Sequence, residues 1–154
     1  MQKIGVVGMG YVGLTFSIVG ANKGLIISRI EKNENILKTI KNGKAHFFEK
    51  KINFNLKNII NKNLFVCDSF KNMGRQDAFV ITVGTPLISD KDGPNIQHII
   101  EALKSISSIF TGSELVVLRS TVSVGVTREH VIPYLSKISG VKQSNLNVAF
   151  CPER

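Results

Sequence analysis

Short runs of apolar residues alternate along the chain with longer segments in which apolar residues recur every three or four positions. The short runs have the length and composition of buried strands and fall at residues 4–7, 25–27, 64–67, 78–83, 115–118 and 146–150. The intervening segments have helical periodicity, most clearly from Asn95 to Phe110 and otherwise over residues 11–23, 33–43, 56–60 and 127–138. Strands that alternate with helices favour parallel pairing. The pattern therefore predicts an α/β fold with a doubly wound, mostly parallel six-stranded sheet, in which residues 1–154 form one domain.

The turn after the first predicted strand carries three glycines at the spacing GxGxxG. Gly8, Gly10 and Gly13 follow a strand and open a helix, which is the setting in which this spacing binds a dinucleotide. The first glycine permits the tight turn, the second lets the backbone approach a pyrophosphate, and the third lets the helix pack closely on the strand. The predicted helix begins at Tyr11, and its first residues, including Val12, present free N–H groups to the phosphates. The segment predicts a Rossmann dinucleotide-binding unit, the alternative being a purely structural turn.

An acidic residue is expected near the end of the second strand of such a unit. Glu31 lies 18 residues after Gly13 and directly follows the segment from Leu25 to Ile30. A carboxylate there accepts hydrogen bonds from ribose hydroxyls and repels a 2′-phosphate, which favours NAD over NADP. Arg29 and Lys32 flank Glu31 and would weaken that discrimination. The alternative for Glu31 is a solvated strand end.

Two further strand ends carry polar residues toward the same edge of the predicted sheet. The fourth strand runs through Val83 into Gly84-Thr85-Pro86, and the fifth runs into Arg119-Ser120-Thr121. Ligands of open parallel sheets bind beyond the carboxyl ends of the strands. We therefore expect Thr85 and Thr121 to contact cofactor or substrate, the alternative being that both are ordinary turn residues.

Composition narrows the classes of protein that the chain can represent. The chain is 43% hydrophobic and 20% charged, as in ordinary globular domains. It has no apolar run long enough to span a bilayer and no signal-peptide pattern, so a cytoplasmic protein without a membrane partner is expected. The net charge of +9 raises the question of nucleic-acid binding, but the lysines are scattered and we expect no nucleic-acid partner. Cys67 and Cys151 lack the spacing of a disulfide framework or a metal site, and both are expected to be buried free thiols.

The order of these motifs resembles the N-terminal NAD-binding domain of the UDP-glucose/GDP-mannose dehydrogenase family, the nucleotide-sugar 6-dehydrogenases. The resemblance runs over essentially all 154 residues and is closest to the branch that acts on UDP-N-acetylhexosamines, such as UDP-N-acetylmannosamine. The motifs that carry it are Gly8-Met9-Gly10-Tyr11-Val12-Gly13-Leu14, Glu31, Phe47-Phe48-Glu49, Val83-Gly84-Thr85-Pro86, Asp92-Gly93-Pro94-Asn95, Ser120-Thr121-Val122 with Gly125, and Cys151-Pro152-Glu153-Arg154.

The resemblance implies oxidation of a sugar C6 alcohol to a carboxylate by two NAD, through a thiohemiacetal and a thioester on a cysteine. It implies that Thr121 helps to position a catalytic water and that Glu153 acts as base or water-orienting group in thioester hydrolysis. It places Thr85 and Pro86 on the nicotinamide side of the NAD site, with Val83, Gly84 and Ser120 beside them. It also implies a nucleotide-sugar substrate, a homo-oligomeric full-length protein and a role in polysaccharide biosynthesis.

The chain departs from the family pattern at several positions. Glu31 replaces the usual Asp, Lys50-Lys51 replaces Pro-Gly, and Ser123 stands where proline is usual and is expected to cap the following helix. The family's catalytic cysteine lies beyond the position of Arg154, so the chain is expected to be a fragment that binds NAD without oxidising a sugar. Two alternatives are a 6-phosphogluconate or β-hydroxyacid dehydrogenase-like enzyme and a non-catalytic NAD-sensing or interaction module.

Overall fold

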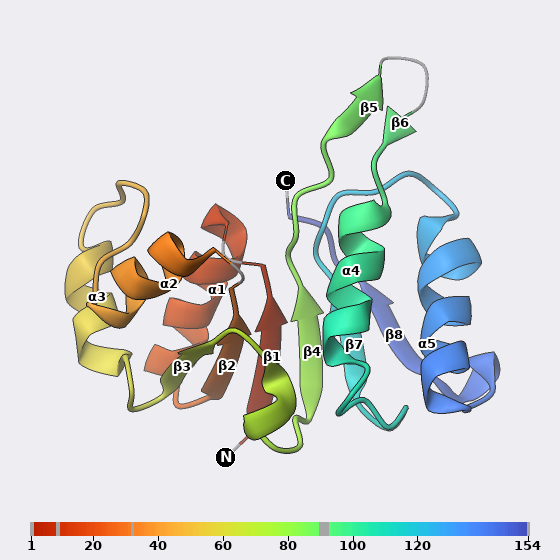
Figure 1. Ribbon diagram of the computed structural model, residues 1–154, viewed down its shortest axis with the longest axis horizontal. Coiled ribbons are helices and arrows are strands. Elements are labelled where there is room, and N and C mark those ends of the chain that lie inside the picture. Colours follow the sequence, from red (N-terminus) through yellow and green to blue (C-terminus); the bar gives the residue numbers. More distant parts are fainter. Residues whose placement is uncertain (1, 9, 32, 90–92, 154) are drawn as a thin grey trace.

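Six parallel strands form the central sheet of the computed structural model, which describes residues 2–8, 10–31, 33–89 and 93–153 (Figure 1). The strands run in the spatial order β3-β2-β1-β4-β7-β8, and every neighbouring pair is parallel. This is the order of a doubly wound dinucleotide-binding sheet, which confirms the predicted fold class. Their bounds are β1 Lys3–Val7, β2 Ile26–Ile30, β3 Leu64–Cys67, β4 Ala78–Ile81, β7 Leu115–Leu118 and β8 Asn147–Phe150.

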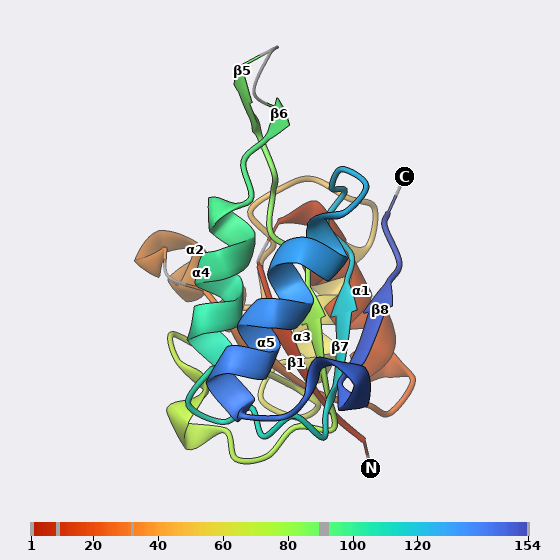
Figure 2. The same ribbon diagram turned by 90° about the vertical axis from the view of Figure 1, so that its right-hand side faces the viewer.

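Helices cover both faces of the sheet (Figure 2). One face carries α1 (Tyr11–Asn22), α2 (Glu34–Lys41) and α3 (Ile52–Ile59), and the other carries α4 (Gln97–Ile106) and α5 (Ile132–Ser139). A π-helical turn, η2 (Thr127–Val131), leads directly into α5. Short 3-10 turns, η1 (Phe70–Asn72) and η3 (Gln143–Asn145), complete the connections. No helix in the described part of the chain is both long enough and apolar enough to cross a membrane.

The two faces of the sheet bury separate hydrophobic cores because successive side chains of a strand point to opposite sides. Val6 belongs to the core beneath α1, α2 and α3, and the next residue, Val7, belongs to the core beneath α4 and α5. The first core also contains Leu14, Ile18, Ile40 and Leu56, and the second contains Phe79, Ile99, Leu103 and Leu135.

The strands end in register at one edge, which explains how distant residues meet. Val7 pairs with Ile30 on one side and Ile81 on the other, and this row continues to Leu118 and Phe150. The residues that leave the sheet at this edge are Gly8, Glu31, Asp68, Thr82, Arg119 and Cys151. β1 and β4 are the neighbours at which the direction of winding reverses, so the edge contains the topological switch point.

Several local predictions differ from the structure. A two-stranded antiparallel ribbon, β5 (Leu87–Ser89) with β6 (Gly93–Pro94), was not predicted because strands of three and two residues have no readable period. It projects beyond the carboxyl edge of the sheet, above α4 (Figure 1). The expected cap at Ser123 is wrong: the helical segment begins only at Thr127, and Ser123 instead accepts a backbone hydrogen bond from Val126. Asn95 does act near its helix, since its side chain accepts from the amide of Gln97 at 2.9 Å.

Candidate dinucleotide-binding site

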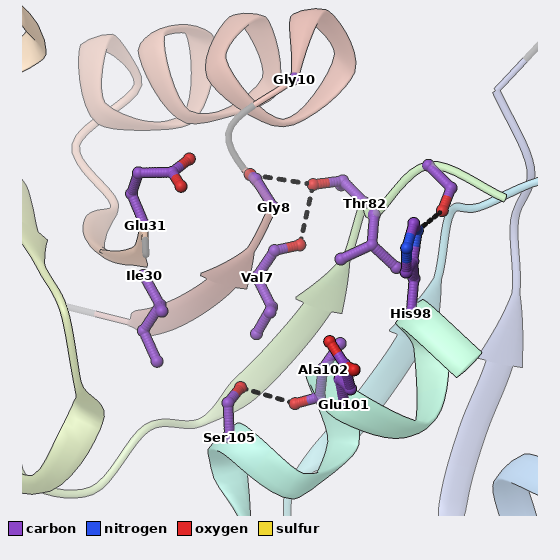
Figure 3. Close-up of a pocket in the computed structure, with 12 residues that line it drawn as sticks. Val7, Gly8, Gly10, Ile30, Glu31, Thr82, His98, Glu101, Ala102 and Ser105 are labelled. Carbon is purple, nitrogen blue, oxygen red and sulfur yellow. Dashed lines mark hydrogen bonds between the residues drawn. The ribbon is translucent and has the colours of Figure 1, made fainter. Parts of the chain in front are cut away.

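The turn between β1 and α1 is fixed by one hydroxyl of the neighbouring strand end. Gly8 has φ +108, a conformation that favours glycine. The Thr82 hydroxyl lies 3.0 Å from the carbonyl oxygen of Val7 and 3.2 Å from that of Gly8 (Figure 3). A Cβ added to Gly8 would lie 2.9 Å from backbone and side-chain atoms of Thr82. The first glycine of the motif is therefore required by close approach as well as by backbone conformation.

The other two glycines of the motif have opposite surroundings. A Cβ at Gly13 would collide with the carbonyl oxygen of Gly8 and the Thr82 hydroxyl, so α1 can pack this closely only without a side chain there. At Gly10 no atom of the described residues lies within 4 Å of an added Cβ. The space in front of Gly10 is where a pyrophosphate would approach the backbone.

The first turn of α1 offers hydrogen-bond donors without a side-chain cap. Gly10 is the N-cap residue, and the first intrahelical bond runs from the amide of Leu14 to the Gly10 carbonyl. The amides of Tyr11, Val12 and Gly13 precede that bond and have no partner in the helix ladder. The first turn also contains no acidic residue, so these donors and the positive end of the helix dipole are suited to bind an anion.

A cavity of about 270 Å³ opens beside this turn, between β1, β2 and α4. Glu31 lies at one side of it and His98 at the other (Figure 3). Its remaining lining comes mainly from strand ends and from one face of α4, namely Val7, Gly8, Gly10, Ile30, Thr82, Val83, Gly84, Glu101, Ala102 and Ser105. A pocket of this size with a carboxylate at one end has the dimensions and polarity to accept part of a nucleotide.

Glu31 faces this cavity, whereas Arg29 does not. The Glu31 carboxylate accepts a hydrogen bond from the amide of Asn33 at 2.6 Å, and a carboxylate has further lone pairs for ribose hydroxyls. Arg29 is fully buried on the α1 side of the sheet. Arg29 is therefore not exposed beside the ribose position, although its charge still acts on Glu31, and Lys32 lies outside the described residues.

A second hollow, of about 210 Å³, continues along the same edge toward β7 and β8. It shares Thr82, Val83 and Gly84 with the first and adds Val12, Thr85, Arg119, Ser120, Thr121 and Glu153. We refer to the two adjoining hollows together as the groove. The two expected catalytic residues, Thr121 and Glu153, lie at the opposite end of this groove from Glu31. An extended dinucleotide has this shape, with its pyrophosphate over the switch point.

Hydrogen bonds join the strand ends around the second hollow. The Thr85 hydroxyl donates to the carbonyl of Thr121 at 2.6 Å, and the Thr121 hydroxyl donates to the carbonyl of Glu153 at 3.3 Å. Ser120 is buried and donates to the Val83 carbonyl at 2.6 Å. The first two bonds link Thr85, Thr121 and Glu153, and the third links Ser120 to Val83.

Arg119 holds the Glu153 side chain. Its guanidinium forms an ion pair with the Glu153 carboxylate, lies 5.9 Å from the Phe16 ring centre, and donates to the Cys151 sulfur at 3.6 Å. Cys151 is exposed, so its expected burial is wrong, because it follows β8 at the open edge of the sheet. Cys67 is half-buried, and burial raises the pKa of its thiol.

The loop that carries Phe47-Phe48-Glu49 folds over the first turn of α1. The Tyr11 hydroxyl donates to the Glu49 carboxylate at 2.5 Å, which raises the pKa of Tyr11, and the Tyr11 and Phe47 rings are 5.0 Å apart. Lys51, at the position where glycine is usual, has φ 64 and ψ 2. The loop therefore contains a left-handed turn at a lysine, a conformation that favours glycine.

Not every expected site residue lines the groove. The Tyr11 side chain is hydrogen-bonded to Glu49, Gly13 is buried beneath the turn, and Pro86 lines neither hollow. Conversely, sequence reasoning gave no role to His98, whose Nδ1 lies 3.0 Å from the carbonyl oxygen of Gly84. The spacing of His98, Glu101 and Ser105 along one helical face could have revealed them. Met9, Asp92 and Arg154 of the sequence motifs lie outside the described residues.

The sheet order, the glycine turn and the acidic residue beside it define a dinucleotide-binding domain of the dehydrogenase class. The chain belongs to the UDP-glucose/GDP-mannose dehydrogenase family: the model of that family's NAD binding domain matches residues 2–154. NAD, expected from the sequence, is the cofactor of this domain family. The match favours the nucleotide-sugar dehydrogenase interpretation over the 6-phosphogluconate dehydrogenase-like alternative.

Relatives and solved structures agree with this assignment. UDP-N-acetyl-D-mannosamine dehydrogenase of Campylobacter jejuni is 31% identical over 161 residues, covering 99% of this chain and 39% of the relative. The structure of UDP-D-ManNAc dehydrogenase from Pyrococcus horikoshii matches with a TM-score of 0.90 and 29% identity, over 99% of this chain and 36% of that one. A ternary complex of GDP-mannose dehydrogenase from Pseudomonas aeruginosa gives a TM-score of 0.89 and 25% identity, over 100% and 36%. The chain thus spans little more than a third of the length of these proteins.

Proposed function

We propose that this chain is the NAD-binding part of a nucleotide-sugar 6-dehydrogenase whose substrate is a UDP-N-acetylhexosamine. The observation that carries the proposal is the continuous groove from Glu31 to Glu153 across the uncapped N-terminus of α1. The substrate class is supported by the relative that is named for UDP-N-acetyl-D-mannosamine, and by the sequence Pro152-Glu153-Arg154, which follows the last strand and resembles that branch of the family.

Each part of the groove would contact one part of the dinucleotide. Glu31 would accept hydrogen bonds from the adenosine ribose, and the amides of the first turn of α1 would bind the pyrophosphate. The residues Val83, Gly84, Thr85 and Ser120 would lie along the nicotinamide half. NAD, when bound there, supplies a hydride acceptor.

Thr121 and Glu153 would act at the reacting end. The ion pair with Arg119 holds the Glu153 carboxylate in place, and its oxygens can accept hydrogen bonds from a water as well. Thr121 is tied to the Glu153 backbone, so the two groups keep a fixed relation. This arrangement suits a carboxylate that orients a water for hydrolysis.

Calorimetric titration of the 154-residue chain with NAD and NADP tests the proposal. We expect NAD to bind and NADP to bind at least about tenfold more weakly, because Glu31 repels a 2′-phosphate. Equal binding of the two, or none, would contradict the cofactor assignment. We expect no sugar carboxylate when the chain alone is mixed with NAD and UDP-N-acetylmannosamine, since the thioester that is hydrolysed to the carboxylate needs a nucleophilic thiol and Cys67 is half-buried with a raised pKa. Carboxylate formation that is lost in Cys151→Ser would show that Cys151 supplies this thiol.

A further inference from the structure

We propose that Arg29 supplies a buried positive charge beneath the phosphate-binding turn and so strengthens the binding of a diphosphate at the N-terminus of α1. The inference rests on the proposed function. It assigns a binding role to Arg29, which belongs neither to the GxGxxG motif nor to the acidic position expected to contact the ribose.

The guanidinium of Arg29 lies directly under the turn. Arg29 belongs to β2 and is fully buried. Its Nη2 donates a hydrogen bond to the carbonyl of Gly8, the first glycine of the motif. A Cβ added to Gly13 would lie 2.8 Å from Nη2, so the guanidinium fills the space between the β1–α1 turn at Gly8 and the first helical turn of α1.

This charge is poorly compensated within the described residues. Nε and Nη1 of Arg29 have no hydrogen-bond partner there, and no carboxylate of the described chain forms an ion pair with it. Burial lowers the pKa of Arg29 to about 9, with an opposing effect of the Glu31 charge, so the side chain is still protonated at pH 7. Burying a charge without a counter-charge is costly.

The surroundings add further positive potential at the same place. The amides and the dipole of α1 converge there, and the first turn contains no acidic side chain. The two positive features lie together on the protein side of the anion site. A diphosphate would supply the missing negative charge, and its attraction to Arg29 would pass through protein rather than water, where charges interact more strongly.

A purely structural Arg29 would only hold the Gly8 carbonyl. It would then affect the stability of the fold and the binding of every ligand alike. A charge that serves a diphosphate has a different consequence: its loss weakens phosphorylated ligands only. The discriminating comparison is therefore between ligands that share adenosine and differ in phosphate.

The experiment measures the affinity of adenosine, ADP and inorganic pyrophosphate for the wild type, Arg29→Met and Arg29→Lys. We expect Arg29→Met to weaken ADP and pyrophosphate about tenfold, the size of one charge interaction of this kind, and to change adenosine less than about twofold. Arg29→Lys, which keeps the charge, should stay within about threefold of wild type. Arg75→Met is the matched control, because it removes one exposed positive charge just before β4, at the opposite end of the strands.

Two outcomes would overturn the inference. One is an equal affinity of wild type and Arg29→Met for pyrophosphate, and the other is an equal loss for adenosine and ADP. If Arg29→Met does not fold, Arg29→Gln gives the same comparison, since it keeps a donor for the Gly8 carbonyl without the charge. If the wild type binds pyrophosphate but not NAD, the proposed function is contradicted. The role of Arg29 is then still decided by comparing the affinities of wild type and Arg29→Met for pyrophosphate.

Discussion

Arg119 and Glu153, which lie 34 residues apart in the chain, form an ion pair because β7 and β8 are neighbours and end in the same row. The Arg119 side chain is 20% exposed and that of Glu153 is 48% exposed. Ion pairs with this much access to water contribute little to stability. The pair is therefore better suited to hold a carboxylate in place than to stabilise the domain.

A double-mutant cycle of Arg119→Met and Glu153→Gln should give a coupling free energy of about 0.5 kcal/mol in urea unfolding, and less at high salt. The matched cycle with exposed Arg128→Met should show no coupling to Glu153. A coupling above about 2 kcal/mol would contradict the assignment of a mainly positioning role.

Glu31 is expected to determine the choice of dinucleotide. Glu31→Ala should weaken NAD about tenfold, since hydrogen bonds to a charged group are lost, and should weaken NADP less or improve it. Glu34→Ala is the control, because Glu34 is exposed in the first turn of α2 and does not line the groove. Calorimetry with both cofactors gives the ratio, and an unchanged ratio in Glu31→Ala would be evidence against ribose recognition by this carboxylate.

The glycines of the motif should separate stability from binding. Gly13→Ala should destabilise the domain by about 1–3 kcal/mol, because its methyl group meets the Gly8 carbonyl and Thr82. Gly10→Ala should cost at most about 1 kcal/mol as a weaker N-cap but should abolish tight NAD binding, because the methyl group enters the open space of the pyrophosphate. Thermal unfolding and NAD titration of both variants check this division. Reversed results would place the ligand elsewhere.

Lys51 stores local backbone strain. A left-handed conformation costs an ordinary residue about 1–2 kcal/mol, and glycine loses about 0.5–1 kcal/mol through its freer unfolded state. Lys51→Gly should therefore raise the free energy of unfolding by about 0.5–1 kcal/mol. Lys50→Gly has no such strain to relieve and should lower it. Urea unfolding of the two variants makes the comparison, and a loss of stability in Lys51→Gly would show that the lysine makes a compensating contact.

The two thiols should react at different rates with a disulfide reagent at pH 8. Cys151 is exposed and should react first. Cys67 is half-buried, and its raised pKa means that less of it is thiolate at this pH, so it should react much more slowly. The same raised pKa implies stability that is present below the pKa of the unfolded thiol and declines as the pH rises through the folded pKa. Cys151→Ser should remove the fast phase and Cys67→Ser the slow one; a fast phase that survives Cys151→Ser would reverse the assignment.

The sequence predicted the features of this fold that depend on local pattern. The glycine turn, the amphipathic α4 and the apolar strands can each be recognised from a short run of consecutive residues. The alternation of strands with helices predicts a parallel sheet. Glu31 was found because its distance from Gly13 is set by the length of one helix and one strand.

Features that depend on which surfaces meet were not predictable from the chain. Nothing in the sequence around Arg29 indicates that its charge is buried, and only the packing of α1 over β2 shows it. His98 lies on a helix whose exposed face happens to border the groove. The contact of Tyr11 with Glu49 joins two segments whose connection passes through β2 and α2.

The Thr82 hydroxyl, shared by the carbonyls of Val7 and Gly8, gives the turn one shape before any ligand arrives. A preorganised binding site loses little conformational entropy when the ligand binds, and binding requires no conformational change. The encounter of dinucleotide and protein at this turn should therefore be a single fast step, with affinity determined by how slowly the ligand leaves.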